Sequence, residues 1–394
     1  MKKALLILNI IFSCSLVAQT TVAHYTDFLN QEHQSPKEYL LGLFEHNDIV
    51  ILGERDHRDT TQYDLILDVI GDERFIKNVG HVYTEVGVTN RTDWANEVLM
   101  KDYPNEQEFE TALVELYREL DFNPLWETYN MYKYLKGVYA INKNLQADEK
   151  ITIGLTDQAF EWKEMNSEKL EEFHKELGST SYYRDSIMAH NFLELYEHQE
   201  PKNGKKKALL IQNRPHACNL MVDYNGHKEK RVGYYVKEKY PNKTKIVVFN
   251  WYKWVPSSWS NKSWGGEHII ELTDDGKWDA SFHLANYKSV AFDIENTPFG
   301  TTEFDYNYKQ GIRFQDVIDG LIFYKPFYEF TCTVGIPNII NETFAVEIMR
   351  REKVIMGEDY KTSVEGLMDY YNDVRTVECT DLERLKQQME KWLK

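Results

Sequence analysis

Short apolar runs alternate with longer segments of helical periodicity along most of the chain. The apolar runs occupy residues 49–52, 81–84, 151–155, 208–211, 246–249, 290–294 and 320–324. Continuous apolar strands separated by helices are typical of a parallel sheet that is buried on both faces. The pattern therefore predicts an α/β fold with a mostly parallel central sheet flanked by helices.

Helical spacing is clearest after the first and second apolar runs. We expect a helix from about Thr60 to Ile70, ending at Gly71, because its apolar residues recur three and four positions apart. Between the second and third strands, residues 94–100, 106–120 and 125–145 also have helical spacing, interrupted by Pro104 and Pro124. This helical insertion is expected to form a wall or lid over the sheet edge.

The chain ends are expected to lie outside the α/β domain, which we place at residues 41–330. After Tyr324 the pattern becomes mainly helical at 345–353, 363–371 and 382–393, which predicts a C-terminal helical extension over 331–394. Residues 20–40 are polar and lack a sustained period, so we expect them to form a polar tether.

The first 19 residues have the pattern of a secretory signal peptide. Lys2 and Lys3 precede an apolar run at 4–17, and Ala18-Gln19 follows as a cleavage region. We therefore expect an exported protein, periplasmic or secreted. An alternative interpretation takes Ile11-Phe12-Ser13-Cys14 as a lipid-attachment box, which would tether the protein through Cys14.

Composition excludes several classes of partner. Acidic residues outnumber basic ones and give a net charge of −17, so the surface repels phosphate backbones and we expect no nucleic-acid partner. No later stretch reaches the roughly 18 uninterrupted apolar residues of a membrane span.

Three cysteines, Cys218, Cys332 and Cys379, lie outside the leader. A disulfide between Cys332 and Cys379 would require an oxidising compartment.

Ionisable residues follow four successive predicted strands. The first strand leads into Gly53-Glu54-Arg55-Asp56-His57, the second ends at Glu85, the third at Asp157, and the fourth leads into Asn213-Arg214-Pro215-His216. Ligands of open parallel sheets bind at the carboxyl ends of strands, where such loops meet. A carboxylate at the end of a buried strand requires a partner, and Arg55, His57 and Arg184 are the candidates for Glu85.

These residues resemble motifs of the erythromycin esterase family within the Tiki/ChaN-like superfamily. The G-E-x-x-H segment is Gly53 to His57, the G-x-x-D segment is Gly154 to Asp157, and Arg184-Asp185 with Met188-Ala189 matches an R-D-x-x-M-A helix. Asn213 to His216 resembles the H-N-x-H loop, and 314–326 resembles the terminal strand. Gln212 or Asn213 stands where the family has its first loop histidine, and Arg58 stands where it usually has glycine.

The resemblance implies a hydrolase that cleaves an ester or lactone. His57 would deprotonate the attacking water, while Glu54, Glu85, Arg184 and His216 hold the base and stabilise developing negative charge. A histidine with an ordinary pKa near 6.5 is largely neutral, and so available as a base, at pH 7. We find no G-x-S-x-G elbow, P-loop or dinucleotide motif, which favours a site that activates water.

Two other functions use overlapping residues. Glu54, His57, Glu85 and His216 are acceptable ligands for a divalent transition metal, as in a Tiki-type metal-dependent hydrolase or protease, although they follow no standard metal motif. A non-catalytic haem or small-ligand binding protein is the third hypothesis, with His46, His81 or His190 as a candidate axial ligand. We otherwise expect no cofactor.

Four tryptophans occur within residues 251–264, after the fifth strand. Aromatic side chains on a polar loop suit a bulky small-molecule or glycosylated substrate, and the alternative is that these rings pack against the sheet edge. We therefore predict substrate contacts from Trp251 and Trp254, and also from Arg55 and Asp157 at the strand ends.

Overall fold

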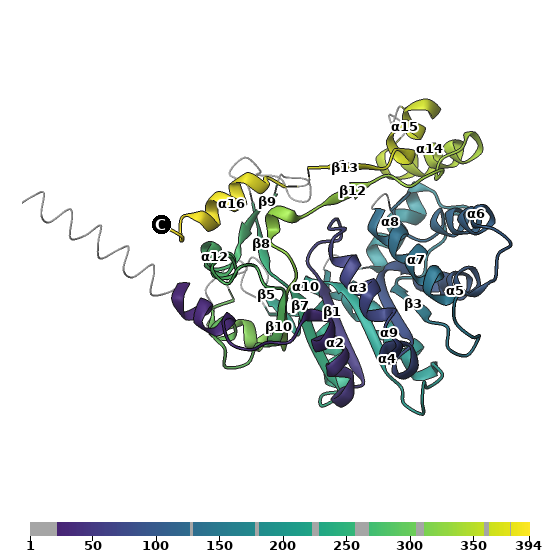
Figure 1. The fold of residues 1–394 in the computed structure, drawn as a ribbon. Coiled ribbons are helices and arrows are strands. Elements are labelled where there is room, and N and C mark those ends of the chain that lie inside the picture. The colour runs from purple at the N-terminus through teal and green to yellow at the C-terminus, as the bar shows by residue number, and fades with distance from the viewer. Residues whose placement is uncertain are drawn as a thin grey trace, which may run out of the picture.

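Seven strands form one sheet in the order β10-β11-β7-β1-β4-β2-β3 (Figure 1). The computed structural model describes residues 22–126, 129–177, 181–222, 228–256, 268–304, 311–357, 362–378 and 380–394. The seven strands are β1 Ile49–Glu54, β2 His81–Val88, β3 Thr152–Asp157, β4 Ala208–Asn213, β7 Thr244–Phe249, β10 Val290–Asp293 and β11 Gly320–Phe323. Only the β10–β11 pair is antiparallel among them. The predicted mostly parallel sheet is confirmed, since each apolar run supplies one strand.

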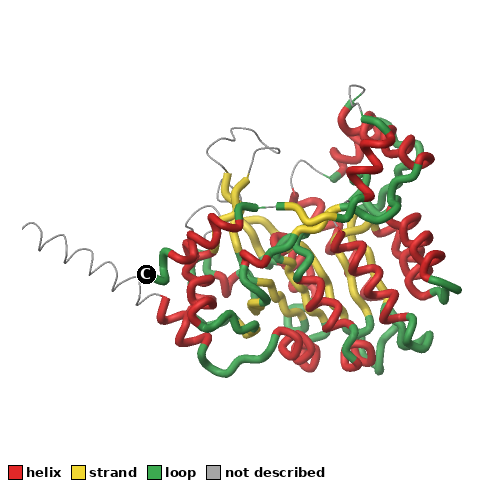
Figure 2. The backbone as a smooth tube through the Cα atoms, turned by 45° about the horizontal axis from the view of Figure 1, so that its top comes forward, coloured by secondary structure: helices red, strands yellow, loops and turns green. Residues whose placement is uncertain are grey.

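Helices cover both faces of this sheet (Figure 2). One face packs against α2 Pro36–His46, α3 Gln62–Ile70, α4 Glu73–Asn78, α5 Thr92–Met100, α6 Glu106–Tyr117 and α7 Tyr129–Asn142. The opposite face packs against α9 Ser181–His198, α10 Arg214–Ala217, α11 Val232–Lys239, α12 Lys277–Leu284 and α13 Pro298–Thr301. Successive side chains of a strand point to opposite faces, so strands between two layers must be apolar throughout.

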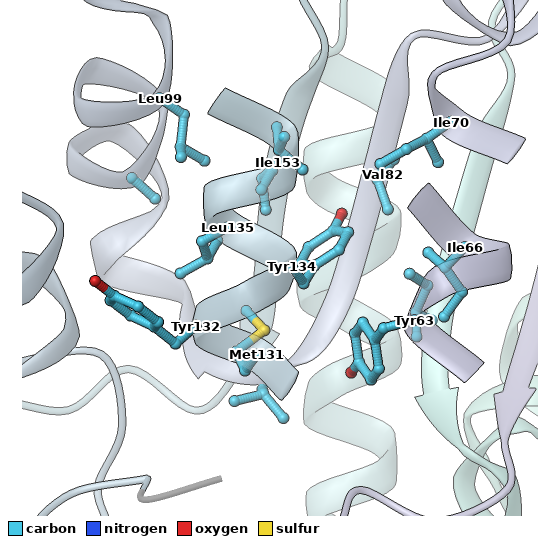
Figure 3. Packing of buried hydrophobic residues seen from close by; sticks show 14 of the residues in the cluster. Tyr63, Ile66, Ile70, Val82, Leu99, Met131, Tyr132, Tyr134, Leu135 and Ile153 are labelled. Atoms are coloured by element: carbon cyan, nitrogen blue, oxygen red, sulfur yellow. The ribbon is translucent and has the colours of Figure 1, made fainter. Parts of the chain in front are cut away.

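The helical insertion between β2 and β3 builds much of one layer. Figure 3 shows Leu99 of α5 and Leu135 of α7 beside Ile153 of β3, with Ile66 of α3 near Val82 of β2. All five side chains are buried, and burying each one stabilises the fold by about 1.5–3 kcal/mol. The insertion is therefore part of the core and a fixed support for the loops at the strand ends.

The N-terminal segment corrects the predicted tether. Residues 22–29 are helical, and Val22, Tyr25 and Leu29 are buried. The Tyr25 ring lies 4.9 Å from that of Phe299. These few apolar residues were too sparse to give a detectable period, yet they face the core, so the tether prediction is wrong from residue 22 onward. The predicted signal peptide lies outside the described residues.

The C-terminal extension contains the three predicted helices. They are α14 Glu342–Met356, α15 Val364–Asn372 and α16 Leu382–Glu390. The sequence did not predict the strands β12 Cys332–Val334 and β13 Arg375–Val377, which pair with each other in an antiparallel ribbon. In Figure 1 this ribbon runs between α16 and the α14–α15 pair above the sheet.

The β12–β13 ribbon also contacts the loop after β1. The backbone N–H of Thr60 donates to the carbonyl of Thr331 at 2.8 Å, and Asp59 forms an antiparallel bridge with Cys332. Cys332 is disulfide-bonded and Cys218 is a buried free thiol, whereas Cys379 lies outside the described residues. The extension thus helps to hold the loop that carries His57.

Two further hairpins and one helix complete the described elements. The hairpins pair β5 Leu220–Val222 with β6 Lys228–Lys230, and β8 Tyr252–Pro256 with β9 His268–Leu272. The helix α8 Ser167–Glu176 packs against α14. None of the helices in the described part of the chain combines the length and the apolar character of a membrane-spanning helix.

Candidate active site

The four strands that carry or lead into the ionisable residues are direct neighbours in the sheet, although β2 continues past Glu85 to Val88. Their order is β1-β4-β2-β3, and Glu54 at the end of β1 is in register with Asn213 at the end of β4. All four are parallel, so their carboxyl ends lie along one edge. This arrangement brings together groups from positions 54 to 216 of the chain.

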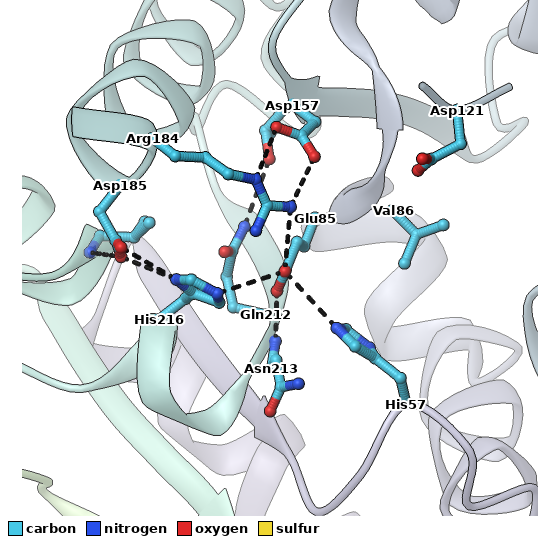
Figure 4. A network of polar contacts seen from close by, with 12 residues as sticks. His57, Glu85, Val86, Asp121, Asp157, Arg184, Asp185, Gln212, Asn213 and His216 are labelled. Atoms are coloured by element: carbon cyan, nitrogen blue, oxygen red, sulfur yellow. Dashed lines mark hydrogen bonds and ion pairs between the residues drawn. The ribbon is translucent and has the colours of Figure 1, made fainter. Parts of the chain in front are cut away.

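Glu85 lies at the centre of the resulting cluster (Figure 4). Its Oε1 atom is 3.5 Å from His57 Nε2, 3.5 Å from His216 Nε2 and 3.3 Å from Arg184 Nη2. Its Oε2 atom accepts a 2.7 Å hydrogen bond from the backbone N–H of Asn213. His57, His216 and Arg184, three residues that the sequence analysis selected, therefore meet at one carboxylate.

A local irregularity of β2 accompanies the position of Glu85. The pairing of β2 with β3 shifts register between Thr84 and Val88, and Gly87 has a φ of +115°. Residues other than glycine rarely adopt this φ, and a Cβ at position 87 would also lie 2.7 Å from the side chain of Leu155. Strand irregularities of this kind redirect side chains next to active sites. Glycine at 87 is thus required by the geometry around Glu85.

His57 is held on one side and open on the other. Its Nδ1 atom lies 2.7 Å from Glu54 Oε2, and the other oxygen of Glu54 accepts a hydrogen bond from the hydroxyl of Tyr63. The Glu54 side chain is 2% exposed, whereas that of His57 is 16% exposed. A ring held through Nδ1 presents Nε2 to Glu85.

His216 has a similar arrangement with a different carboxylate. Its Nδ1 atom lies 3.0 Å from both oxygens of Asp185, whose side chain is completely buried. Asp185 is a residue that the sequence reasoning placed in a family motif but not in the site. The two histidines thus each pair one ring nitrogen with a buried acid and direct the other toward Glu85.

Arg184 links Glu85 to Asp157. Its Nε and Nη2 atoms donate to the two carboxylate oxygens of Asp157 at 3.1 and 2.6 Å. Asp157 thus lies next to the cluster through Arg184, and its side chain is 1% exposed, which leaves little open surface for a substrate. Asp121 is also near, and burial together with the charge of Asp157 raises the pKa of Asp121 to about 6.

Mutual charge interactions control ionisation at the centre. Burial lowers the pKa of His57, but the charges of Glu54 and Glu85 outweigh this effect and raise that pKa well above its usual value. Burial likewise raises the pKa of Glu85, but His216, His57 and Arg184 outweigh it and hold that pKa well below its usual value. The structure therefore favours an ion pair, and His57 differs from the ordinary, mostly neutral histidine expected from sequence.

The helical insertion adds two aromatic side chains to the site. The Trp126 ring lies edge-on to His57 at a centroid distance of 5.3 Å, and the Arg184 guanidinium lies 5.8 Å from the Phe122 ring centroid. Both rings are half-buried. Val88 N–H donates to Leu120 O at 2.9 Å, which attaches this segment to β2. The expected wall over the sheet edge is therefore present, with aromatic residues that the sequence reasoning did not select.

Arg55 does not join the cluster. Its guanidinium is buried against Asp59, the side-chain oxygen of Asn250 and the backbone carbonyl of Lys325. Only 1% of its surface is exposed. Of the three candidate partners of Glu85, Arg55 is the one that does not contact it, because the turn after β1 points this side chain toward the C-terminal segment. The buried guanidinium has little open surface for a substrate.

Trp251 also has a packing role. It is 3% exposed, and its ring lies 5.5 Å from Phe304 and 5.7 Å from Phe314, with the Arg214 guanidinium 4.8 Å away. The Trp251 ring therefore packs mainly against other side chains of the interior. The side chain of Trp254, and the whole of Trp259 and Trp264, lie outside the described residues.

The carboxylates and imidazoles of the site are already paired with one another and with Arg184. In the described ranges, no group of three or more His, Cys, Asp or Glu side chains is arranged to hold a metal ion. Among the residues offered as haem ligands, His81 is buried between Thr152 and the carbonyl of Glu200, and His190 is exposed on α9.

Comparisons with known proteins agree with this architecture. The sequence model described as erythromycin esterase matches residues 61–324. A Bacillus cereus protein of solved structure has a TM-score of 0.50 and 13% identity over 77% of this chain and 97% of its own. A succinoglycan biosynthesis protein has a TM-score of 0.52 and 10% identity over 78% of this chain and 97% of its own.

An erythromycin esterase in its open conformation has a TM-score of 0.44 and 12% identity over 73% of this chain and 92% of its own. No curated protein matches the chain. The family match covers more than half of the chain and includes β2, β3 and β4 with the groups that they carry. The chain belongs to the erythromycin esterase family.

Proposed function

We propose that this protein is an exported hydrolase that cleaves an ester or lactone bond with a water molecule activated by His57. The observation that carries the proposal is the pairing of His57 Nδ1 with buried Glu54, while Nε2 of the same ring faces Glu85 and the side chain stays 16% exposed. A carboxylate that orients an imidazole in this way supports general-base catalysis, which contributes about 100- to 10,000-fold to a rate.

The proton acceptor in this reaction is His57 Nε2. The water binds on the open side of the ring, loses a proton to Nε2 and attacks the carbonyl carbon, and the protonated ring then returns a proton to the leaving oxygen. Glu54 stabilises the positive charge that His57 carries between these steps. The raised pKa of His57 makes it a stronger base, but it reduces the fraction of neutral ring at pH 7.

Arg184 and His216 are proposed to stabilise the oxyanion. Burial lowers the pKa of Arg184, but Asp157 and Glu85 raise it above its usual value, so the guanidinium stays charged. Its side chain is 26% exposed, compared with 1% for Asp157, so Arg184 is the more accessible member of this pair. A single oxyanion donor is worth about 2.7–4 kcal/mol of transition-state stabilisation.

The substrate is proposed to be a small or glycosylated molecule with an apolar part. Phe122 and Trp126 offer half-buried aromatic surface next to Arg184 and His57. Export is supported by the leader-like pattern at residues 1–19 and by the disulfide at Cys332, because disulfides persist in oxidising compartments.

The test is turnover by the purified protein on a panel of aryl esters, alkyl esters and macrocyclic lactones. We expect His57→Ala to abolish turnover and His190→Ala, an exposed histidine on α9, to leave it unchanged. Undiminished turnover in His57→Ala would refute the assignment. Loss of turnover on chelation, restored by a divalent transition metal, would instead support the metal-dependent reaction.

A further inference from the structure

Asp185 is a completely buried carboxylate whose contacts extend beyond His216. We propose that Asp185 is a positioning residue that fixes the tautomer and orientation of His216, and that Arg231 and the start of α11 hold Asp185 in place. The proposal rests on the function proposed above, because it assigns a supporting residue to the same site. It extends the site to Arg231 and the start of α11, which do not contact Glu85 themselves.

Every oxygen of Asp185 is committed. Oδ1 accepts a 3.0 Å hydrogen bond from the backbone N–H of Val232, and Oδ2 lies 3.1 Å from Nη1 of Arg231. Both oxygens also lie 3.0 Å from Nδ1 of His216. These donors hold the Asp185 carboxylate in one orientation, because a rotated carboxylate would lose hydrogen bonds while its charge stays buried.

These contacts determine which nitrogen of His216 carries a proton. The Asp185 carboxylate can only accept, so Nδ1 of His216 must donate. In the neutral ring Nε2 is then an acceptor, and it lies 3.5 Å from Glu85 Oε1 on the partly accessible side. In the charged ring Nε2 is a donor to Glu85 or to a developing oxyanion. Either form requires Asp185 to keep the Nδ1 proton in place.

Arg231 connects this pair to a different part of the fold. It lies between β6 and α11, is 10% exposed at its side chain, and also pairs with Glu229 of β6. Glu229, Arg231, Asp185, His216 and Glu85 thus form a continuous series of contacts from the β5–β6 hairpin to the centre of the site. Figure 4 shows the inner part of this series, with Asp185 and His216 on one side of Glu85 and His57 on the other.

The sequence contains a matched control for a buried acid. Asp279 of α12 is also buried, and burial raises its pKa to about 7 despite the opposing charge of Arg55, but it contacts no residue of the cluster among those described. Asp185→Asn and Asp279→Asn therefore make the same chemical change at two buried positions. Only the first should affect His216.

The first experiment measures ester turnover by the full chain and by Asp185→Asn. We expect kcat to fall at least 100-fold with KM changed less than threefold, since an amide in place of a triad carboxylate lowers kcat by about 10,000-fold where it reverses the tautomer. In a His216→Ala background the same change should have no further effect. The proposal would be overturned if Asp185→Asn lowered kcat by the same factor in the His216→Ala protein as in the parent protein. It would also be overturned if Asp185→Asn alone left kcat unchanged.

The second experiment does not depend on activity. The ring nitrogens of His216 are observed by ¹⁵N NMR and assigned by their disappearance in His216→Ala. We expect Nδ1 to be protonated across the folded pH range in the parent protein and in Asp279→Asn, but not in Asp185→Asn. An unchanged His216 spectrum in Asp185→Asn overturns the positioning role, even if the parent protein hydrolyses no ester.

A milder variant covers the case in which Asp185→Asn does not fold. Arg231→Lys keeps a positive charge near Asp185 but removes the planar fork that reaches Glu229 and Asp185 together. We expect it to lower kcat by about tenfold, the factor for 1.4 kcal/mol of lost hydrogen bonding, and to broaden the His216 signals. If the His216 signals and kcat of Arg231→Lys were identical to those of the parent protein, Arg231 would not be holding Asp185 in place.

Discussion

His57 and His216 direct their Nε2 atoms at the same oxygen of Glu85, each from a distance of 3.5 Å. Each ring has its other nitrogen beside a buried acid, Glu54 for His57 and Asp185 for His216. Two neutral rings in this arrangement would point two lone pairs at a carboxylate, which is unfavourable. At least one proton is therefore shared around Glu85, and the raised pKa of His57 is consistent with this.

The pH dependence of turnover follows from that ionisation. If neutral His57 is the base, kcat/KM should rise as the pH increases above 7, because His57 loses its proton only at its raised pKa. The measurement is kcat/KM from pH 5 to 10 for an activated ester, corrected for spontaneous hydrolysis. A profile that is already flat from pH 6.5 upward would contradict this prediction.

The same ionisation affects stability with a defined sign. A folded pKa above the unfolded value means that charged His57 stabilises the fold below about pH 6.5, and that this contribution disappears as the pH rises through the folded pKa. The difference in unfolding free energy between the parent protein and His57→Ala should therefore shrink toward alkaline pH. Urea titrations at pH 6 and 9.5 measure it, and a constant difference would argue that His57 is neutral in the fold.

Glu85→Gln removes the negative charge that faces His57, His216 and Arg184. At pH 7 we expect a loss of about 3–5 kcal/mol in unfolding free energy, the usual cost of leaving buried charges without their partner. The folded pKa of Glu85 is depressed, so its contribution is present above about pH 4.3 and is lost as the pH falls through the folded pKa. The difference in unfolding free energy between the parent protein and Glu85→Gln should therefore become smaller at acidic pH.

Urea titrations at pH 7, 5 and 3.5 test this dependence. Glu171→Gln on α8, which changes an exposed glutamate, is the control and should leave the unfolding midpoint unchanged. A Glu85→Gln protein as stable as the parent at pH 7 would show that the cluster is not held together by this carboxylate.

Trp126→Ala should change substrate preference more than turnover itself. The ring lies beside His57, so an acyl chain that reaches it gains apolar contact, worth about fourfold in kcat/KM for each buried methylene. We expect the variant to lose more activity on octanoate than on acetate esters, and Trp126→Phe to retain most of the preference. Equal losses on all chain lengths would indicate that Trp126 serves only to pack the insertion.

Reduction of the disulfide at Cys332 should destabilise the protein by about 2–4 kcal/mol. The β12 strand that carries Cys332 contacts the loop after β1, so we also expect turnover to fall after reduction. Thermal unfolding with and without reductant measures the effect. Cys332→Ala should show the lower stability and no further response, while Cys218→Ala should still respond; identical midpoints with and without reductant would rule out a stabilising disulfide.

The amino-acid sequence by itself determined the elements of this fold and their class. Strand and helix periods are local properties of consecutive residues, so all seven strands of the sheet and the helices of the insertion were predictable. Glu54, His57, Glu85, Arg184 and His216 were also identifiable, because each one lies in a motif or at a strand end. The short strands β5, β6, β12 and β13 were not, since three residues carry no detectable period.

Tertiary structure alone decided which side chains meet. Glu85 and Arg184 are 99 residues apart, and their contact depends on β2 lying beside β3 and on the packing of α9, which no local pattern encodes. The same packing turned Arg55 and Trp251 into the interior and placed Asp185, Arg231 and Trp126 around the histidines. Burial then set the ionisation of the cluster, because a charge in a low-dielectric interior is governed by its nearest partners.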